Sequence, residues 1–398
     1  MVSPPGIVLR ALISYVNGST DCTLTYRTGN PSMATTETDT QELGHMKFLH
    51  AGRVGELFPI ALINALLNIL TLTLYRFWGK TRVRSYLWGS TSLLDDRLEY
   101  TGTGGELFKG FLFVLFAIFL PVGILNTVVE FNFSPDDPVS IAYNGLLFAG
   151  IWFLVGIALY RARRYRLSRT RWRGVRAGQT GSAAAYGGKY LGFFILNILT
   201  LGWTYPLMRM RLMHQMMNNT WFGDRRFAFS GSARHLYGRF AVSWITFVGL
   251  FVLLSIVSGI IGVIGAYAAL NSIDSIDSIF PLAATILVVG FLVLLPIIFC
   301  WYKAAEVSYF AKSTRFEGAA FELDTTLGSL LWLLVGNLLI SISTLGFGAA
   351  FTQMRTFRYV CNRLHANGII DFDAIIQSSD KGPGFGEGLA DAFDVGAV

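Results

Sequence analysis

Four uninterrupted apolar runs, each long enough to cross a membrane, constrain the fold of this 398-residue chain more than any other feature. A bilayer core about 30 Å thick needs roughly 20 apolar residues in a helix. Only 14% of the residues are charged, whereas soluble domains usually have about 25%. The sequence therefore predicts a protein that passes through the membrane several times. The runs are Phe111–Val129, Ile141–Tyr160, Phe240–Leu270 and Phe280–Tyr302.

Three other apolar stretches are interrupted by Asn, Thr and Gly, and they indicate an internal repeat. The hexapeptide LNILTL occurs at residues 67–72 and again at residues 196–201, and the two copies stay in register from Thr71 and Thr200 onwards without a gap. A third copy places Thr344 on Thr200. Such periodic self-similarity is typical of a chain built from repeated structural units. The stretches are Leu57–Trp78, Tyr190–Met208 and Leu327–Phe351.

The repeat predicts how the chain is divided. Each full unit has an interrupted stretch, a basic connector and two spans, and the third unit ends after its connector. The first 32 residues belong either to a start assigned too far upstream or to an extension. The expected segments are a polar or poorly ordered extension (1–46), repeat 1 (47–169), repeat 2 (170–313), a truncated repeat 3 (314–375) and a Gly-rich acidic tail (376–398).

The distribution of charge predicts the topology. The loop Glu130–Ser140 has three acids and no Lys or Arg, and Asn271–Ile279 has two Asp, whereas residues 161–176 carry eight Arg. The positive-inside rule places basic segments and the C-terminus in the cytoplasm. Interrupted stretches that crossed fully, as inverted units, would move either 161–189 or 209–239 outside. The rule therefore favours re-entrant hairpins that turn at the Thr-Leu-Gly motif, with inverted units as the alternative.

Short segments of alternating polarity predict strands outside the membrane. Arg97–Thr101 and Arg226–Ser230 would pair with linker strands near Arg171–Ala177 and Phe316–Glu322. The expected fold is an all-α polytopic membrane protein. Its repeats would each hold a broken, re-entrant helical hairpin and a two-helix transmembrane hairpin, with small cytoplasmic β elements.

Two segments carry a family resemblance. The run FPIALINALLNILTLTLYRFWGKTRVRSYLWGST is followed shortly by DDRLEYTGTGGELFKG, and EGLADAFD lies near the C-terminus. Over roughly residues 47–394 the chain resembles the YjgN family of bacterial inner-membrane proteins. The resemblance implies a location in the inner membrane and a fold family, and it implies no substrate, activity or catalytic residue.

Polar side chains at membrane depth are the candidate functional residues, because polar groups in hydrocarbon are costly unless they are satisfied. They would either cap the broken helices or line a polar path where the hairpins meet. Three arginines recur at the hairpin exits, where they would contact lipid headgroups or attract an anion. The polar candidates are Asn64, Asn68, Thr71, Asn197, Thr200, Asn337 and Thr344, and the arginines are Arg82, Arg211 and Arg355.

The motifs of common enzymes are missing from the sequence. It has no HExxH, no GxSxG elbow and no P-loop, so neither an enzyme nor a cofactor or metal site is expected. The +7 charge falls between apolar runs, which indicates cytoplasmic loops rather than a nucleic-acid surface. Membrane lipids are the expected partners, and a second copy or another membrane protein stays open. The predicted function is a transporter or channel-like protein for a small or anionic solute, and the alternative is a non-catalytic membrane scaffold.

Overall fold

The computed structural model describes residues 46–270, 279–368 and 370–379, together with Leu389 and Ala392, all within one compact unit, Leu43–Val398. The predicted N-terminal extension, most of the loop Asn271–Ile279 and most of the 376–398 tail lie outside these residues. In the described part, ten short strands form one closed antiparallel barrel. The strands are β1 (Met46–His50), β2 (Thr91–Leu93), β3 (Asp96–Tyr100), β4 (Thr170–Trp172), β5 (Val175–Gln179), β6 (Thr220–Phe222), β7 (Arg225–Phe229), β8 (Thr314–Phe316), β9 (Ala319–Leu323) and β10 (Leu364–Asn367).

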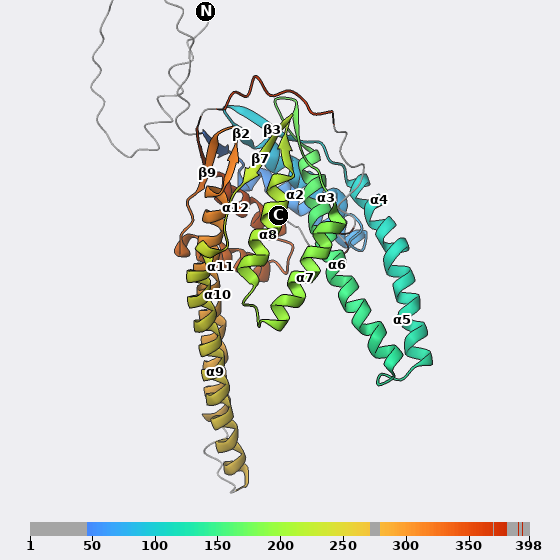
Figure 1. The fold of residues 1–398 in the computed structure, drawn as a ribbon, viewed down its shortest axis with the longest axis vertical. Helices are drawn as coiled ribbons and strands as arrows, with labels where there is room; N and C mark the ends of the chain where they lie inside the picture. The colour runs from blue at the N-terminus through green and yellow to red at the C-terminus, as the bar shows by residue number, and fades with distance from the viewer. Residues whose placement is uncertain (1–45, 271–278, 369, 380–388, 390–391, 393–398) are drawn as a thin grey trace, which may run out of the picture. The chain divides into compact units, whose positions relative to one another are not determined.

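Each strand of the barrel pairs with the next along the chain, and β10 closes the ring against β1 through Met46 and Ala366. Helices connect each odd strand to the even strand that follows it (Figure 1). They are α2 (Val54–Leu70), α3 (Arg76–Gly89), α4 (Gly104–Val114), the π-helical turn η1 (Leu115–Phe119), α5 (Leu120–Asn132), α6 (Pro138–Ser168), α7 (Ala183–Leu199), α8 (Tyr205–Asn218), α9 (Arg234–Leu270), α10 (Ile279–Lys312), α11 (Leu327–Ser343) and α12 (Ala349–Cys361).

This order of connections gives the barrel two different rims. Odd strands end, and even strands begin, at the same rim, so every helical hairpin leaves the barrel and returns to it there. We call this the helical rim. Two-residue turns connect each even strand to the next odd strand at the opposite rim, which we call the turn rim.

The local sequence explains the turns at the turn rim. Two-residue turns between antiparallel strands favour positive φ angles, because their twist then matches that of the strands. Leu94 and Asp95 have φ of 50° and 64°, and Arg173 and Gly174 have 48° and 75°. Gly223 begins the turn between β6 and β7 with φ of 59°.

A threonine marks the point where a helix passes into a strand. Thr91, Thr170, Thr220 and Thr314 are the first residues of β2, β4, β6 and β8. Each hydroxyl donates to the carbonyl four residues earlier, at 2.8–2.9 Å. The hydroxyl satisfies a carbonyl that the ending helix leaves without an intrahelical partner.

The three interrupted stretches fold as short helical hairpins, α2–α3, α7–α8 and α11–α12. The helix break predicted at the Thr-Leu-Gly motif is present in all three, including the first, where Thr73 replaces Gly. Leu72, Leu201 and Leu345 have φ of 48–51°. The next residue closes the turn with a 2.6–2.8 Å hydrogen bond to the carbonyl five residues earlier, as in a helix C-cap.

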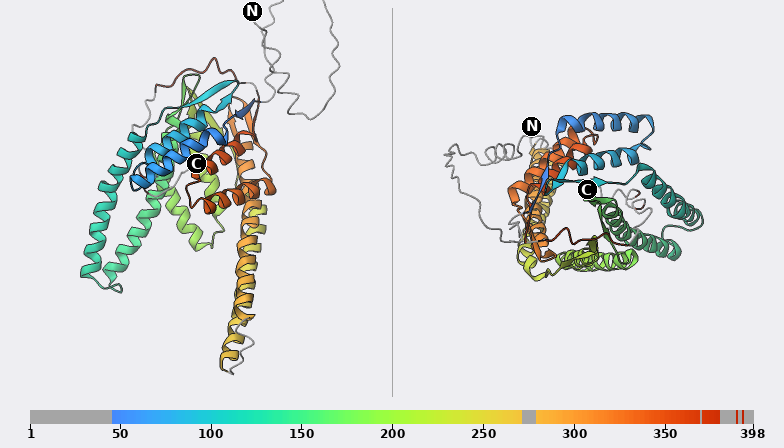
Figure 2. Two further views of the ribbon diagram at one scale, coloured as in Figure 1. Left: turned by 180° about the vertical axis from the view of Figure 1, so that it is seen from behind. Right: turned by 90° about the horizontal axis from the view of Figure 1, so that it is seen from above.

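The remaining helices form two long hairpins, α4–α6 and α9–α10, whose paired helices lie side by side (Figures 1 and 2). In the described part, four helical segments are long and apolar enough to cross a membrane: Gly104–Asn132, Pro138–Ser168, Arg234–Tyr267 and Leu292–Lys312. Their large apolar side chains are exposed, among them Phe131 at 87% and Leu146 at 74%. Such faces suit lipid rather than water.

Close packing joins the helices near the helical rim. Gly156 of α6 faces α7, and a Cβ added to it would lie 2.8 Å from Gly187 Cα, so only small residues allow this approach. Leu57, Val83 and Met354 form a buried cluster that joins α2, α3 and α12. Fully burying such a side chain contributes about 2 kcal/mol.

The prediction of an all-α membrane protein is wrong, because the closed barrel connects all parts of the described chain. β3 and β4 do pair, through Leu98 and Trp172, and so do β7 and β8, through Phe227 and Phe316, as the alternating segments suggested. These pairs were expected to stay separate. Instead each is continued by β5–β6 and β9–β10 into one ring, because an isolated two-stranded pair leaves its edges unpaired.

Candidate functional site

The inside of the barrel is apolar and its outside is charged. Along each strand, alternate side chains point to opposite faces. In β1, Met46 and Phe48 face inward whereas Lys47 faces outward; in β4, Trp172 faces inward and Arg171 outward. A water-exposed barrel with an apolar interior is the consequence of this alternation.

The interior is not completely filled. A cavity of about 500 Å³ lies within the barrel and extends between the helices at the helical rim. Barrels of about eight strands are just wide enough for side chains to fill or to hold one small ligand, and the diameter grows with strand number. Ten strands therefore leave space, and small inward residues such as Ala177 and Ala366 do not fill it. The volume falls within the usual range for ligand pockets, about 300–1,000 Å³.

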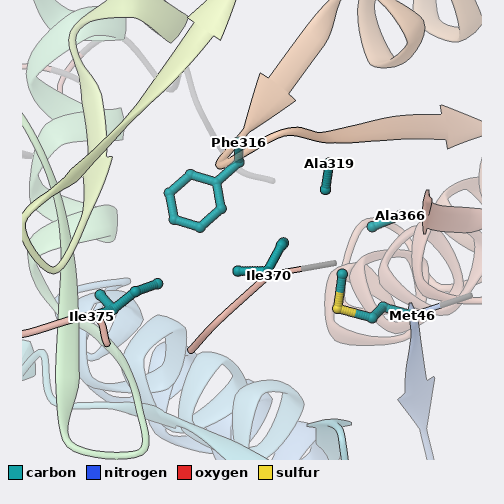
Figure 3. Close-up of a cluster of buried hydrophobic side chains, with 6 residues drawn as sticks. All are labelled: Met46, Phe316, Ala319, Ala366, Ile370 and Ile375. Atoms are coloured by element: carbon teal, nitrogen blue, oxygen red, sulfur yellow. The ribbon is translucent and has the colours of Figure 1, made fainter. Parts of the chain in front are cut away.

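The C-terminal segment closes the turn rim. We call residues 370–379 the C-terminal strap. Ile370 and Ile375 are 5% and 6% exposed and pack with Met46 and Phe316, and Figure 3 shows Ile370 between these two side chains. Phe372 packs edge-on against Trp172, with ring centroids 4.8 Å apart.

Polar contacts attach the strap to the turns it covers. Asp224 of the β6–β7 turn accepts from the Ile376 amide at 3.3 Å, and Gln377 accepts from the Arg176 amide at 2.8 Å. The strap therefore covers the turn rim, and its Ile370 and Phe372 line the cavity at that end.

We call the part of the cavity at the helical rim, between the ends of α6, α8 and α10, the neck. Leu167, Met213, Met217 and Phe310 line the neck and are apolar. The charged side chain in this lining is Arg163 of α6. Its position is notable because it brings a guanidinium into a space otherwise bounded by hydrocarbon and threonine.

Arg163 contacts neutral groups. Its Nη1 donates to the Met216 carbonyl at 3.3 Å and to Thr220 Oγ1 at 2.9 Å, and its Nη2 lies 3.3 Å from Met217 Sδ. Within the described residues it forms no ion pair with Asp or Glu. A guanidinium has five N–H donors and stays charged in proteins, so these contacts leave both the charge and some donor capacity without an acidic partner.

A second cavity of about 280 Å³ adjoins the first, and the two share Phe48, Leu98 and Leu364. It lies among α3, α6 and α12, and Arg84 and Arg166 line it. Arg84 is 4% exposed and donates to Tyr100 Oη at 3.3 Å. No Asp or Glu of the described chain lines either cavity, so the joined space is apolar with a positive margin.

The asparagines predicted at membrane depth bond inside their own hairpins. Asn64 Nδ2 donates to the Gly79 carbonyl at 3.2 Å, Asn197 Oδ1 accepts from Thr204 Oγ1 at 2.8 Å, and Asn337 Nδ2 donates to Thr356 Oγ1 at 3.1 Å. These bonds tie the first helix of each hairpin to its turn or to its second helix.

The threonines of the motif form hydrogen bonds to the backbone at the turns of the three hairpins. Thr71, Thr200 and Thr344 each donate to the carbonyl four residues earlier at 2.6–2.7 Å. Thr71 and Thr344 also accept an amide four residues later, at 2.9 Å and 2.8 Å. Their contacts are those of helix caps.

The structure brings some of these candidates together but not all. Asn64 and Asn68 line a cavity of about 200 Å³ between the first and third hairpins, and Asn68 Oδ1 is buried without a hydrogen-bond partner. Asn197 and Asn337 do not line that cavity.

The recurrent arginines lie on the outer sides of the second helices. Arg82 stacks over the Tyr75 ring at 5.5 Å, Arg211 is exposed, and Arg355 lies beside α11 with Nη2 3.5 Å from the Trp332 carbonyl. Their positions suit contacts outside the barrel, and none of them lines the barrel cavity.

Sequence reasoning missed the residues that distinguish the site. Arg163 belongs to a run of eight arginines that the sequence assigns to a cytoplasmic loop, and the predicted strands form separate elements. A usable signal is the alternation itself, because most inward positions of the strands hold Met, Leu, Ala, Trp or Phe. The described residues include no group of three or more His, Cys, Asp or Glu that could hold a metal ion.

Comparison with known proteins gives a family but no structural relative. The family described as "Bacterial protein of unknown function (DUF898)" matches residues 45–392. Proteins named "Inner membrane protein YjgN" are similar over shorter segments: the Salmonella typhimurium protein is 31% identical over 75 residues (19% of each chain), and that of Escherichia coli K12 is 34% identical over 92 residues (23% of this chain, 21% of the relative). The matches thus span about a fifth of these relatives. No solved structure matches.

Proposed function

The chain belongs to the DUF898 family of bacterial proteins, and we propose that it is an inner-membrane protein that binds an acyl chain inside its barrel. The cavity of about 500 Å³ carries this proposal. An apolar cavity of this size is unfavourable to water, which needs polar partners, and it gains free energy when hydrocarbon occupies it.

The connections of the barrel support a specific topology. Every helical hairpin starts and ends at the helical rim, so the barrel lies on one side of the membrane and the hairpins extend toward it. Charged residues such as Arg97, Glu99 and Arg226 on the outer barrel surface suit water, and the positive-inside rule assigns them to the cytoplasm. The short hairpins then dip into the bilayer, and α4–α6 and α9–α10 cross it and return.

The topology can be tested with alkaline phosphatase fusions. Fusion after Asp136, at the tip of the α5–α6 hairpin, should be active because that tip is outside. Fusion after Gly102, at the helical rim, should be inactive. Activity after Gly102 would contradict a cytoplasmic barrel.

Acyl-chain binding agrees with the way the cavity opens. The C-terminal strap closes the turn rim, and the neck faces the hairpins and therefore the lipid. A chain from the membrane would enter the barrel without crossing water. A polar path through the hairpins finds less support, since the bonds of Asn197 and Asn337 stay within single hairpins. Solute transport and the scaffold alternative stay predictions.

The binding experiment uses the full chain in detergent, washed free of loosely held lipid and examined by native mass spectrometry. We expect one acyl ligand per chain. Ala366→Phe places a ring inside the cavity and should reduce the occupancy severalfold. Ala320→Phe is the matched control, because Ala320 pairs with Arg315 and Asn367 and lies on the outer face of β9.

Two results would contradict the proposal. One is a wild-type chain that carries no acyl ligand even when incubated with one. The other is an Ala366→Phe variant that is as stable as wild type and carries the same ligand at the same occupancy. Ala177→Phe repeats the test from a different strand, because Ala177 lines the same cavity from β5.

A further inference from the structure

We propose that Arg163 binds the carboxylate of a single-chain fatty acid whose tail occupies the barrel. This inference rests on the acyl-binding function proposed above and names the class of ligand. It starts from the positive charge of Arg163, which no Asp or Glu among the described residues contacts.

The position of Arg163 is the first argument. It lies at the neck, with the apolar barrel on one side and the ends of the hairpins on the other. An amphiphile that enters the barrel tail-first leaves its headgroup at this neck. Headgroup and guanidinium then meet at the depth where the membrane gives way to the barrel.

The chemistry of the neck is the second argument. The acceptors of Arg163 are a carbonyl, a hydroxyl and a thioether. Thr220 already donates its hydroxyl proton to the Met216 carbonyl at 2.8 Å, so these two groups satisfy each other without the arginine. Its contacts hold the guanidinium in place, but an anion would form a charge-assisted hydrogen bond that the described residues do not provide.

The amount of charge selects the headgroup. A single guanidinium balances one negative charge, as on a carboxylate. A phosphate monoester carries about −1.5 to −2 at neutral pH and would bring an excess negative charge into an apolar cavity. Arg84 and Arg166 line the adjoining cavity, and Arg163 is the charged side chain that lines the barrel cavity itself. The geometry therefore favours a carboxylic acid over a phosphate lipid.

The experiment compares three probes with the same sixteen-carbon chain, added at pH 8 to the full-length protein and measured by native mass spectrometry. The probes are palmitic acid, the neutral monoacylglycerol of palmitate and the corresponding lysophosphatidic acid. We expect the acid to bind about tenfold more tightly than the neutral ester, the factor that one charged hydrogen bond supplies. The phosphate should bind more weakly than the acid.

Arg163→Met should remove the preference for the acid and leave binding of the monoacylglycerol unchanged. Arg163→Lys keeps a positive charge and should keep part of the preference. Arg161→Met is the matched control, because Arg161 is exposed on the same helix, and it should bind all three probes as wild type does.

The outcomes separate the two proposals. If no probe binds, or if Ala366→Phe binds every probe as wild type does, the barrel is not the acyl site. If the probes bind in the barrel but wild type binds acid and ester equally, or Arg163→Met keeps the preference, then Arg163 does not recognise the headgroup. If lysophosphatidic acid bound more tightly than palmitic acid, the choice of a carboxylate headgroup would be wrong.

Discussion

Two arginines, Arg209 of the short hairpin α7–α8 and Arg163 of the long hairpin α4–α6, differ in what surrounds their charge. Arg209 of α8 meets the fully buried carboxylate of Glu306 at 2.7 Å, and Lys303 pairs with the other carboxylate oxygen. Arg163 of α6 lies at the neck of the cavity, where its hydrogen-bond partners among the described residues are neutral groups. Both arginines belong to helices that run into the barrel, yet within the described residues an acid contacts Arg209 and none contacts Arg163.

The difference separates a structural charge from one available to a ligand. The cluster of Arg209, Lys303 and Glu306 joins α8 to α10, and both of its cations contact the one buried carboxylate. A buried ion pair of this kind costs desolvation when it forms, and it costs more when one partner is lost. Among the described residues, no acid contacts Arg163, so an ion pair within this part of the chain does not explain a guanidinium in an apolar neck.

Substitution of Glu306 should have the largest effect on stability. Glu306→Gln removes the negative charge and leaves the two cations of the cluster close together. We expect a loss of about 3 kcal/mol, the lower end for a broken buried pair, because Arg209 retains partial exposure of 38%. The measurement is thermal unfolding in detergent, followed by circular dichroism.

Arg163→Met provides the contrasting case in the same assay. The new side chain is apolar and enters an apolar neck. The two oxygen acceptors of Arg163, the Met216 carbonyl and the Thr220 hydroxyl, keep the hydrogen bond between them. We expect a change below about 1 kcal/mol. If the two substitutions destabilise the protein equally, the comparison fails and Arg163 is structural. Glu317→Gln is the control for Glu306, since Glu317 is an exposed partner of Arg225 and such pairs contribute little.

Much of the local structure could be predicted from the sequence. The spans, the helix breaks at the Thr-Leu-Gly motif and several strands were recognisable, because each follows from hydrophobic period or turn chemistry within a short window. The resemblance to the YjgN family is confirmed, since the family matches residues 45–392.

The barrel could not be predicted in the same way. Its strands are only three to five residues long, and β1 finds β10 through the pair Met46 and Ala366 at opposite ends of the described chain. Nothing in a short alternating segment identifies a partner so distant. The site was missed for the same reason, because only closure of the ring distinguishes Arg163 from its exposed neighbour Arg161.

His50 is a third basic side chain that is partly buried, and it gives the smallest predicted effect. Its Nδ1 lies 2.8 Å from Thr91 Oγ1. That hydroxyl donates to the Leu87 carbonyl, so Nδ1 carries the proton, and buried Nε2 has no partner. Burial, and secondarily the charge of Arg358, lowers the pKa of His50 below its ordinary 6.5. His50 can thus avoid the cost of burying a charge by losing its proton, whereas an arginine stays charged.

The lowered pKa of His50 gives stability a dependence on pH. The unfolded chain binds a proton below pH 6.5 while the folded chain still resists it, so the free energy of unfolding should be constant above that pH and fall beneath it. The slope is at most about 1.4 kcal/mol per pH unit for one proton. Unfolding temperatures measured from pH 7.5 to 5 should decline less steeply for His50→Gln than for wild type. Parallel declines for the two proteins would mean that His50 accepts its proton in the folded state without cost and would contradict this prediction.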